Sequence, residues 1–118
     1  MKNYMAPMEG VTNWVYRNAY HDCFYPMDKY FTPFITAKPN KRLSSKEVSP
    51  DTNGNLPVIP QILTNNAEDF IKTAHIFRDE YGHKEVNLNL GCPSGTVTAK
   101  GKGAGFLGEP DKLDRFLD

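Results

Sequence analysis

The chain has 118 residues, and its 14 basic and 14 acidic side chains give a formal net charge of zero. This length fits one domain with a modest core, and the balanced charge excludes a strong overall attraction to nucleic acid or membrane surfaces. The apolar runs are too short to cross a bilayer, and no basic stretch followed by an apolar one opens the sequence. We therefore expect a cytoplasmic protein that makes no membrane contact.

Segments typical of strands alternate along the chain with segments typical of helices. The expected strands are residues 3–9, 27–36, 57–64 and 85–91. The expected helices are residues 12–24, a weak helix within 44–49, residues 67–81 and residues 110–118, with a glycine-rich loop at 92–109. Such alternation predicts a parallel sheet, either open or part of a (β/α)8 barrel. A whole barrel needs about 250 residues, so these units would supply half of one.

The apolar faces of the two longer helices can be assigned from their spacing. The helix at 12–24 is expected to be capped by Thr12. Its expected buried side chains are Val15, Ala19 and Phe24. The helix at 67–81 ends at Gly82, and its expected buried face is Phe70, Ile71, Ala74, Phe77 and Tyr81.

The two cysteines, Cys23 and Cys92, form no CxxC pair and no metal spacing with the histidines, so the sequence predicts neither a disulfide scaffold nor a metal site. Cys23 is expected simply to pack within its helix. Cys92 directly follows a strand, between Gly91 and Pro93. Parallel β/α proteins bind substrates beyond the carboxyl ends of their strands, which favours a functional cysteine over a small buried apolar residue in a turn.

The chemistry expected of Cys92 is proton donation. An ordinary thiol, with a pKa of about 8.5, is mostly protonated near neutral pH. No histidine stands close to Cys92 in the sequence to act as its base. A nucleophilic thiolate remains the alternative, since the spatial neighbours of Cys92 do not follow from the sequence.

Asn87 and Asn89 alternate with aliphatic residues, which places both amides on one face of their strand. Amides offer a donor and an acceptor together, as the edge of a flavin or a nucleobase requires. They could equally satisfy the barrel's own polar layer.

The loop at 92–109 contains GxGxxG, at Gly103, Gly105 and Gly108. A dinucleotide fingerprint needs an apolar strand before it and an acidic residue about 20 positions after it, and this sequence has neither. Lys100 and Lys102 could instead contact a phosphate backbone, or the loop could be a solvated turn. A basic cluster at Lys38, Lys41, Arg42 and Lys46 could also contact RNA, although a solvated loop is the default interpretation.

Three segments carry a resemblance to a known family: APMEGVT at 6–12, PQIL at 60–63 and NLNLGCPSGTVTAKGKGAGFL at 87–107. In order and spacing they resemble the N-terminal part of the tRNA-dihydrouridine synthases. The resemblance implies an α/β fold, the N-terminal half of a TIM (β/α)8 barrel with about four β/α units and parallel strands. It also implies FMN as cofactor, NADPH as reductant, tRNA as partner and reduction of the 5,6 double bond of uridine.

The resemblance also assigns roles to single residues. Pro7, Met8, Glu9 and Gln61 would contact FMN, and Cys92 would be the catalytic proton donor. Asn89, Lys100 and Lys102 would contact the substrate. Glu9 departs from the small residue that is more often expected at its position.

The resemblance covers residues 1–118 as a partial FMN-binding barrel domain, with the C-terminal half-barrel and the helical tRNA-binding domain absent. We therefore expect a fragment that holds FMN weakly or not at all, is inactive alone and self-associates through its open sheet edges. Two alternatives are a flavoprotein resembling dihydroorotate or dihydropyrimidine dehydrogenases and a non-catalytic β/α module that binds RNA or a partner.

Overall fold

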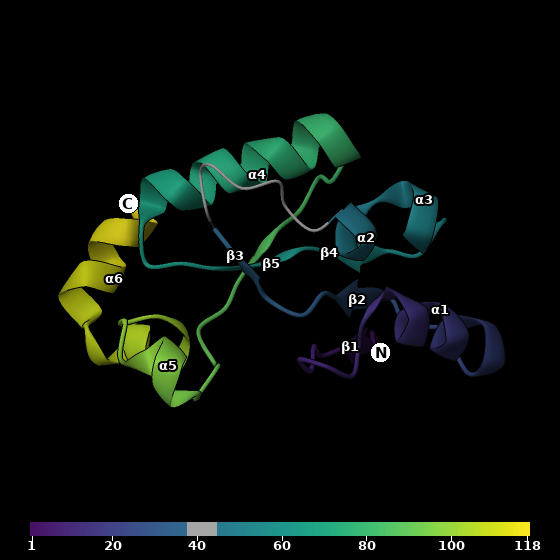
Figure 1. Cartoon of the computed structure of the whole chain (residues 1–118), viewed down its shortest axis with the longest axis horizontal. Helices are drawn as coiled ribbons and strands as arrows, with labels where there is room; N and C mark the ends of the chain where they lie inside the picture. Colours follow the sequence, from purple (N-terminus) through teal and green to yellow (C-terminus); the bar gives the residue numbers. More distant parts are fainter. Residues whose placement is uncertain (38–44) are drawn as a thin grey trace.

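The structure is a computed structural model that describes residues 1–37 and 45–118. Short strands lie at its centre with helices around them (Figure 1). The strands are β1 (Tyr4–Met5), β2 (Lys29–Phe31), β3 (Ile35–Thr36), β4 (Val58–Ile59), β5 (Gln61–Leu63) and β6 (Asn87–Leu88). The helices are α1 (Trp14–Cys23), α2 (Ser45–Val48), α3 (Pro50–Asn53), α4 (Ala67–Tyr81), α5 (Gly95–Thr98), the 3-10 helix η1 (Gly103–Gly108) and α6 (Pro110–Leu117).

The strands pair in parallel, in the orders β1-β2-β4 and β3-β5-β6. The predicted α/β class with parallel strands is therefore confirmed. Two expected strands are split, 27–36 into β2 and β3 and 57–64 into β4 and β5. Pro33 and Pro60 stand at the splits, where proline has no N–H to donate. Thr32 bridges the gap, because its N–H donates to the Ile59 carbonyl and its hydroxyl accepts from the Gln61 N–H at 3.0 Å.

The core consists of two apolar clusters on the strands. In one, Met5, Tyr30 and Val58 are direct neighbours across β1, β2 and β4. In the other, Ile62 of β5 packs with Phe77 of α4, and both are fully buried. The two clusters fix the strands from both sheets, so the strand ends that carry polar residues have a rigid base.

Helix α4 follows its sequence pattern closely. The Asn66 side chain caps it by accepting from the Asp69 N–H, and Gly82 ends it in the left-handed region with φ of 76°. Phe77 is buried as expected, but Ile71 is exposed and Thr73 is buried in its place. The predicted face was thus rotated slightly from the observed one.

The expectations for α1 were mostly wrong. Asn13, and not Thr12, caps the helix, because the Asn13 side chain accepts from the Tyr16 N–H. The residues expected to be buried, Val15, Ala19 and Phe24, are exposed, and Cys23 is exposed as well. The buried residue of α1 is Arg17.

Arg17 is fully buried, and its guanidinium binds groups from three segments. Nη1 donates to the Thr12 carbonyl at 3.0 Å and to the Glu47 carboxylate at 2.8 Å. Nη2 donates to the Glu47 carbonyl at 2.8 Å and to the Asn53 side chain at 2.9 Å. Burial lowers the pKa of Arg17 from its usual value, and the hydrogen bond and charge of Glu47 oppose that shift. The cluster therefore ties α1 to α2 and α3 through charge rather than apolar packing.

The region predicted as one glycine-rich loop contains α5 and η1. The sequence has no apolar periodicity there, so its short helices gave no signal. Helix α6 begins at Pro110, as expected for proline in a first turn.

Replacing Glu47 should destabilise the protein much more than replacing an exposed carboxylate. Glu47→Ala leaves the buried Arg17 without its counter-charge, which costs about 3 kcal/mol of unfolding free energy. The control is Glu68→Ala, which removes the exposed ion pair with Lys72 and should cost far less. Urea denaturation followed by circular dichroism measures both, and equal small losses would contradict the role given to Arg17.

Candidate functional site

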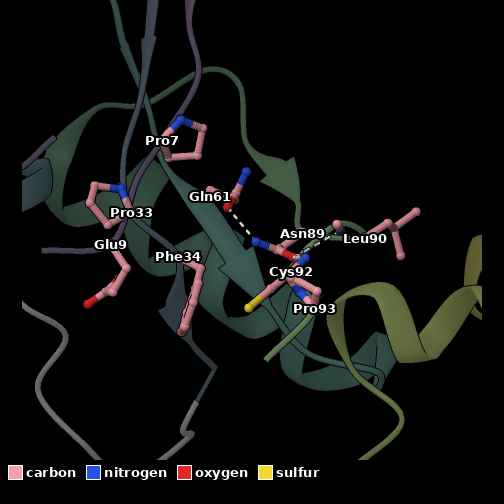
Figure 2. A pocket seen from close by; sticks show the side chains of 10 residues that line it. Pro7, Glu9, Pro33, Phe34, Gln61, Asn89, Leu90, Cys92 and Pro93 are labelled. Atoms are coloured by element: carbon pink, nitrogen blue, oxygen red, sulfur yellow. Dashed lines mark hydrogen bonds between the residues drawn. The ribbon is translucent and has the colours of Figure 1, made fainter. Parts of the chain in front are cut away.

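A pocket of about 390 Å³ lies at the carboxyl ends of the strands (Figure 2). Its walls come from Gln61 of β5 and from the segments that follow β1, β2 and β6. They are Pro7, Glu9, Pro33, Phe34, Gln61, Asn89, Leu90, Gly91, Cys92 and Pro93. Proteins built on parallel strands bind ligands at this edge, so the pocket is the candidate site.

Three side-chain amides form a hydrogen-bonded chain along the site. Gln61 Nε2 donates to Asn87 Oδ1 at 2.8 Å, and Asn89 Nδ2 donates to Gln61 Oε1 at 2.7 Å. Figure 2 shows the second of these bonds beside Cys92. We call Asn87, Gln61 and Asn89 the amide chain.

Strand register brings the amide chain together. Gln61 is paired with Asn87 across β5 and β6, and paired residues in a sheet project from the same face. Asn89 lies two residues after Asn87 and so projects from that face too. Gln61 therefore lies within reach of both asparagines, while Ile62 projects into the opposite, apolar side.

The amide chain ends on the backbone of the cysteine loop. Asn89 Oδ1 accepts from the Cys92 N–H at 3.0 Å and from the Gly91 N–H at 3.2 Å. Because this oxygen is committed to two donors, the Asn89 NH₂ must face Gln61, and the same logic orients the Gln61 amide toward Asn87. The orientation of every amide in the chain is thus fixed by the loop that carries the thiol.

Cys92 is half-buried and its side chain lines the pocket. Its N–H is held by Asn89, and its carbonyl accepts from the Ala104 N–H at 3.0 Å. Both backbone polar groups of Cys92 are therefore bonded, one by the amide chain and one by η1. Such anchoring fixes the direction in which the thiol leaves the backbone.

The structure brings five of the predicted site residues into one pocket: Pro7, Glu9, Gln61, Asn89 and Cys92. Three others lie outside its walls. Met8 is 61% exposed and is absent from the lining, and Lys100 and Lys102 belong to the segment between α5 and η1. The carbonyl of Lys100 accepts from Asn65 Nδ2 at 2.9 Å, which ties that segment to the start of α4.

The sequence interpretation missed five residues of the wall: Pro33, Phe34, Leu90, Gly91 and Pro93. Pro33 and Phe34 lie between β2 and β3, where only the proline in the middle of a strand pattern hinted at a break toward the site. Leu90 and Pro93 flank the cysteine motif. Of the predicted basic cluster, Lys46 is exposed on α2, and Lys38, Lys41 and Arg42 lie outside the described residues.

Two further properties bear on the site. Within residues 1–37 and 45–118, no group of three or more His, Cys, Asp or Glu side chains is placed to hold a metal ion. The same residues include no helix with the length and apolar character needed to cross a membrane.

Comparison with known proteins gives the family. The sequence profile described as dihydrouridine synthase matches residues 4–118. The chain belongs to the dihydrouridine synthase family. The resemblance inferred from the sequence motifs is thereby confirmed, and the amide chain and Cys92 lie within the matched residues.

Relatives in this family are considerably longer than the chain. The probable tRNA-dihydrouridine synthase 2 of Bacillus subtilis is 32% identical over 110 residues, which cover 90% of the chain and 33% of the relative. The probable tRNA-dihydrouridine synthase of Staphylococcus epidermidis ATCC 12228 is 32% identical over 117 residues, covering 96% of the chain and 35% of the relative. The chain thus spans about a third of the length of these dihydrouridine synthase relatives.

Replacing Asn89 with a residue that cannot accept hydrogen bonds should loosen the cysteine loop. Asn89→Leu leaves the N–H groups of Gly91 and Cys92 without their acceptor, which costs about 1 kcal/mol of unfolding free energy because both groups are at least partly exposed.

The matched control is Asn89→Asp, which keeps an acceptor for both N–H groups while the Gln61 and Asn87 amides both turn over, so that Gln61 donates to the new carboxylate and Asn87 donates to Gln61. It should retain more of the stability than Asn89→Leu. Thermal and urea unfolding give the comparison, and equal stability of the leucine variant and the parent would show that these bonds contribute nothing.

Proposed function

We propose that the chain forms the flavin-binding and cysteine-bearing part of an enzyme that reduces uridine to dihydrouridine in tRNA. The observation that carries this proposal is the pocket in which Cys92 and the amide chain meet at the carboxyl ends of parallel strands. Family membership and the names of the relatives support the reaction and the tRNA substrate.

We further propose that these strands are the first half of a (β/α)8 barrel. The strand order supports this, because β1 pairs with β2, β2 with β4, β3 with β5, and β5 with β6. Taking β2 with β3 and β4 with β5 as two interrupted strands gives neighbours that follow chain order, as in a barrel wall. The remaining wall would come from sequence corresponding to the rest of the longer relatives.

The residues of the pocket fit FMN. The Gln61 side chain gives one Nε2 hydrogen to Asn87 and keeps the second, and a flavin edge presents carbonyl and ring-nitrogen acceptors to such a donor. Pro7, Pro33 and Phe34 supply apolar wall for a planar ring. Glu9 lines the same pocket and Met8 does not, so among the residues after β1 we assign FMN contact to Pro7 and Glu9.

The chemistry that reduced FMN supplies when bound is a hydride for C6 of uracil, with NADPH as the source of electrons. Addition at C6 leaves negative charge shared between C5 and the O4 oxygen of the base. Cys92 donates its thiol proton to C5, so that each carbon gains one C–H bond and the 5,6 double bond is lost. The thiolate then regains a proton from solvent.

The tRNA must deliver its uridine to this pocket as an unstacked base. Asn89 lies beside Cys92 and would hold the uracil edge, although its own oxygen is already bonded to the cysteine loop. Lys100 and Lys102 lie on the segment after Cys92, outside the pocket wall, where they would contact the phosphate backbone around the target.

The chain should self-associate when it is isolated. Strand β1 is paired only with β2 and strand β6 only with β5 among the described strands, which leaves backbone groups on their outer edges open to another copy. Analytical ultracentrifugation over a range of concentrations should show dimers or larger species. A single monomeric species at every concentration would contradict this prediction.

Removing the thiol should stop catalysis without releasing the cofactor. In the full reading frame that contains this sequence, Cys92→Ala should reduce dihydrouridine formation at least about a hundredfold, because no acid remains at C5. The control Cys23→Ala removes an exposed cysteine of α1 and should leave activity unchanged. Dihydrouridine in tRNA from a deficient strain is the measurement, flavin absorbance reports bound FMN, and near-normal turnover of Cys92→Ala would overturn the assignment.

A further inference from the structure

The segment after Cys92 folds back and packs against the cysteine itself. At Gly103 the backbone has φ of 56°, a left-handed conformation that side chains disfavour. A Cβ on Gly103 would lie 2.7 Å from the Cys92 carbonyl oxygen, 3.0 Å from Cys92 Cβ and 2.9 Å from Val97 Cγ1. All three approaches are too close for a side chain, and the first is to backbone. Only glycine fits between η1 and the cysteine loop.

The contact with Gly103 belongs to an arrangement that we call the clasp, which consists of the hydrogen bonds that Asn89 and Ala104 make to the backbone of Cys92. The next residue, Ala104, donates its N–H to the Cys92 carbonyl at 3.0 Å, and this bond needs the close approach that Gly103 allows. On the other side Asn89 accepts from the Cys92 N–H. The backbone of Cys92 is thus hydrogen-bonded on one side to the segment after β6 and on the other side to the start of η1.

Helix η1, which carries Ala104, itself packs against α5 and α6. Gly105 lies against the Thr98 carbonyl, where a Cβ would come within 2.6 Å of the oxygen, so η1 sits directly on α5. Phe106 of η1 is 1% exposed, and its ring lies 5.4 Å from that of Phe116 in α6. The Phe116 ring in turn lies 5.6 Å from Phe70 of α4. A continuous series of packed residues therefore connects α4, α6 and η1 to Cys92.

We propose that Gly103 is a positioning residue for the Cys92 thiol, a role that rests on the proposed acid function of Cys92. It acts by admitting the Ala104 N–H to the Cys92 carbonyl, and it lies outside the pocket wall. The GxGxxG spacing of Gly103, Gly105 and Gly108 is then explained by packing of η1 on the cysteine loop and α5, without a dinucleotide.

Matched glycine substitutions separate positioning from general loosening of the loop. Gly101→Ala carries the same kind of backbone strain, with φ of 64°, but its Cβ would meet the flexible Glu109 carboxylate at 2.8 Å and not Cys92. Gly108→Ala has nothing within 4 Å and serves as the neutral control. All variants are made in a Cys23→Ser background so that Cys92 is the one cysteine of the chain.

The primary measurement is the rate of Cys92 alkylation by iodoacetamide, with the thermal midpoint measured in parallel. Gly103→Ala should speed alkylation about tenfold, because the clasp opens and exposes the half-buried cysteine. Gly101→Ala should lower the thermal midpoint while changing the alkylation rate less than about twofold, and Gly108→Ala should change neither. Equal acceleration in Gly101→Ala and Gly103→Ala, or none in Gly103→Ala, would overturn the proposal.

A second variant covers the case in which Gly103→Ala unfolds. Adding Val97→Ala removes one of the clashing groups and leaves the clash with Cys92. This double variant should regain thermal stability and still react rapidly, whereas a parent-like alkylation rate would overturn the proposal.

Turnover distinguishes the proposal from the function on which it rests. In the full reading frame, Gly103→Ala should lower kcat for uridine reduction with KM for tRNA unchanged, as expected for a displaced proton donor. If kcat is unchanged in Gly103→Ala while Cys92→Ala loses activity, the positioning role of Gly103 is wrong and the acid role of Cys92 stands. Normal activity in Cys92→Ala would reject the acid role of Cys92, on which the proposal rests, and leave the alkylation result standing.

Discussion

The structure around the site depends on one constraint, the commitment of Asn89 Oδ1 to the backbone N–H groups of Gly91 and Cys92. This oxygen fixes the direction of the Asn89 amide, which fixes Gln61, which fixes Asn87. The Gln61 side chain, which lines the pocket, is thereby linked through Asn89 to the loop that carries the thiol. In a half-buried site such a chain is stable only when each member is satisfied, and here each member finds a partner on a neighbouring strand or loop.

A buried side chain with several hydrogen-bond partners also supports the loop that follows β1. The Arg17 guanidinium is fully buried, yet it reaches the Thr12 carbonyl, Glu47 and Asn53. Glu47 also lines a hollow of about 390 Å³ that includes Glu9, a wall residue of the candidate site. The loop between β1 and α1 is therefore supported by a charged cluster, whereas the loop that carries Cys92 is supported by amides and glycines.

Much of the architecture was predictable because it follows from local rules. Asn66 and Gly82 mark the ends of α4 by capping chemistry, and the alternation at Asn87 and Asn89 correctly placed both amides on one face. The motif around Cys92 predicted the right family. The burial of Arg17 was not predictable, because it depends on Glu47 and Asn53, thirty or more residues away. Helix η1 was also missed, since its stability comes from glycine contacts with Cys92 and Thr98 and not from an apolar period.

The central claim is that Cys92 is held through both of its backbone polar groups at once. Residue-resolved native-state hydrogen exchange tests it most directly, because the Cys92 N–H donates to Asn89 and the Ala104 N–H donates to the Cys92 carbonyl. The account predicts that both amides exchange far more slowly than an open loop and share one opening free energy. Exchange of the Cys92 amide at the rate of an unstructured loop would contradict it.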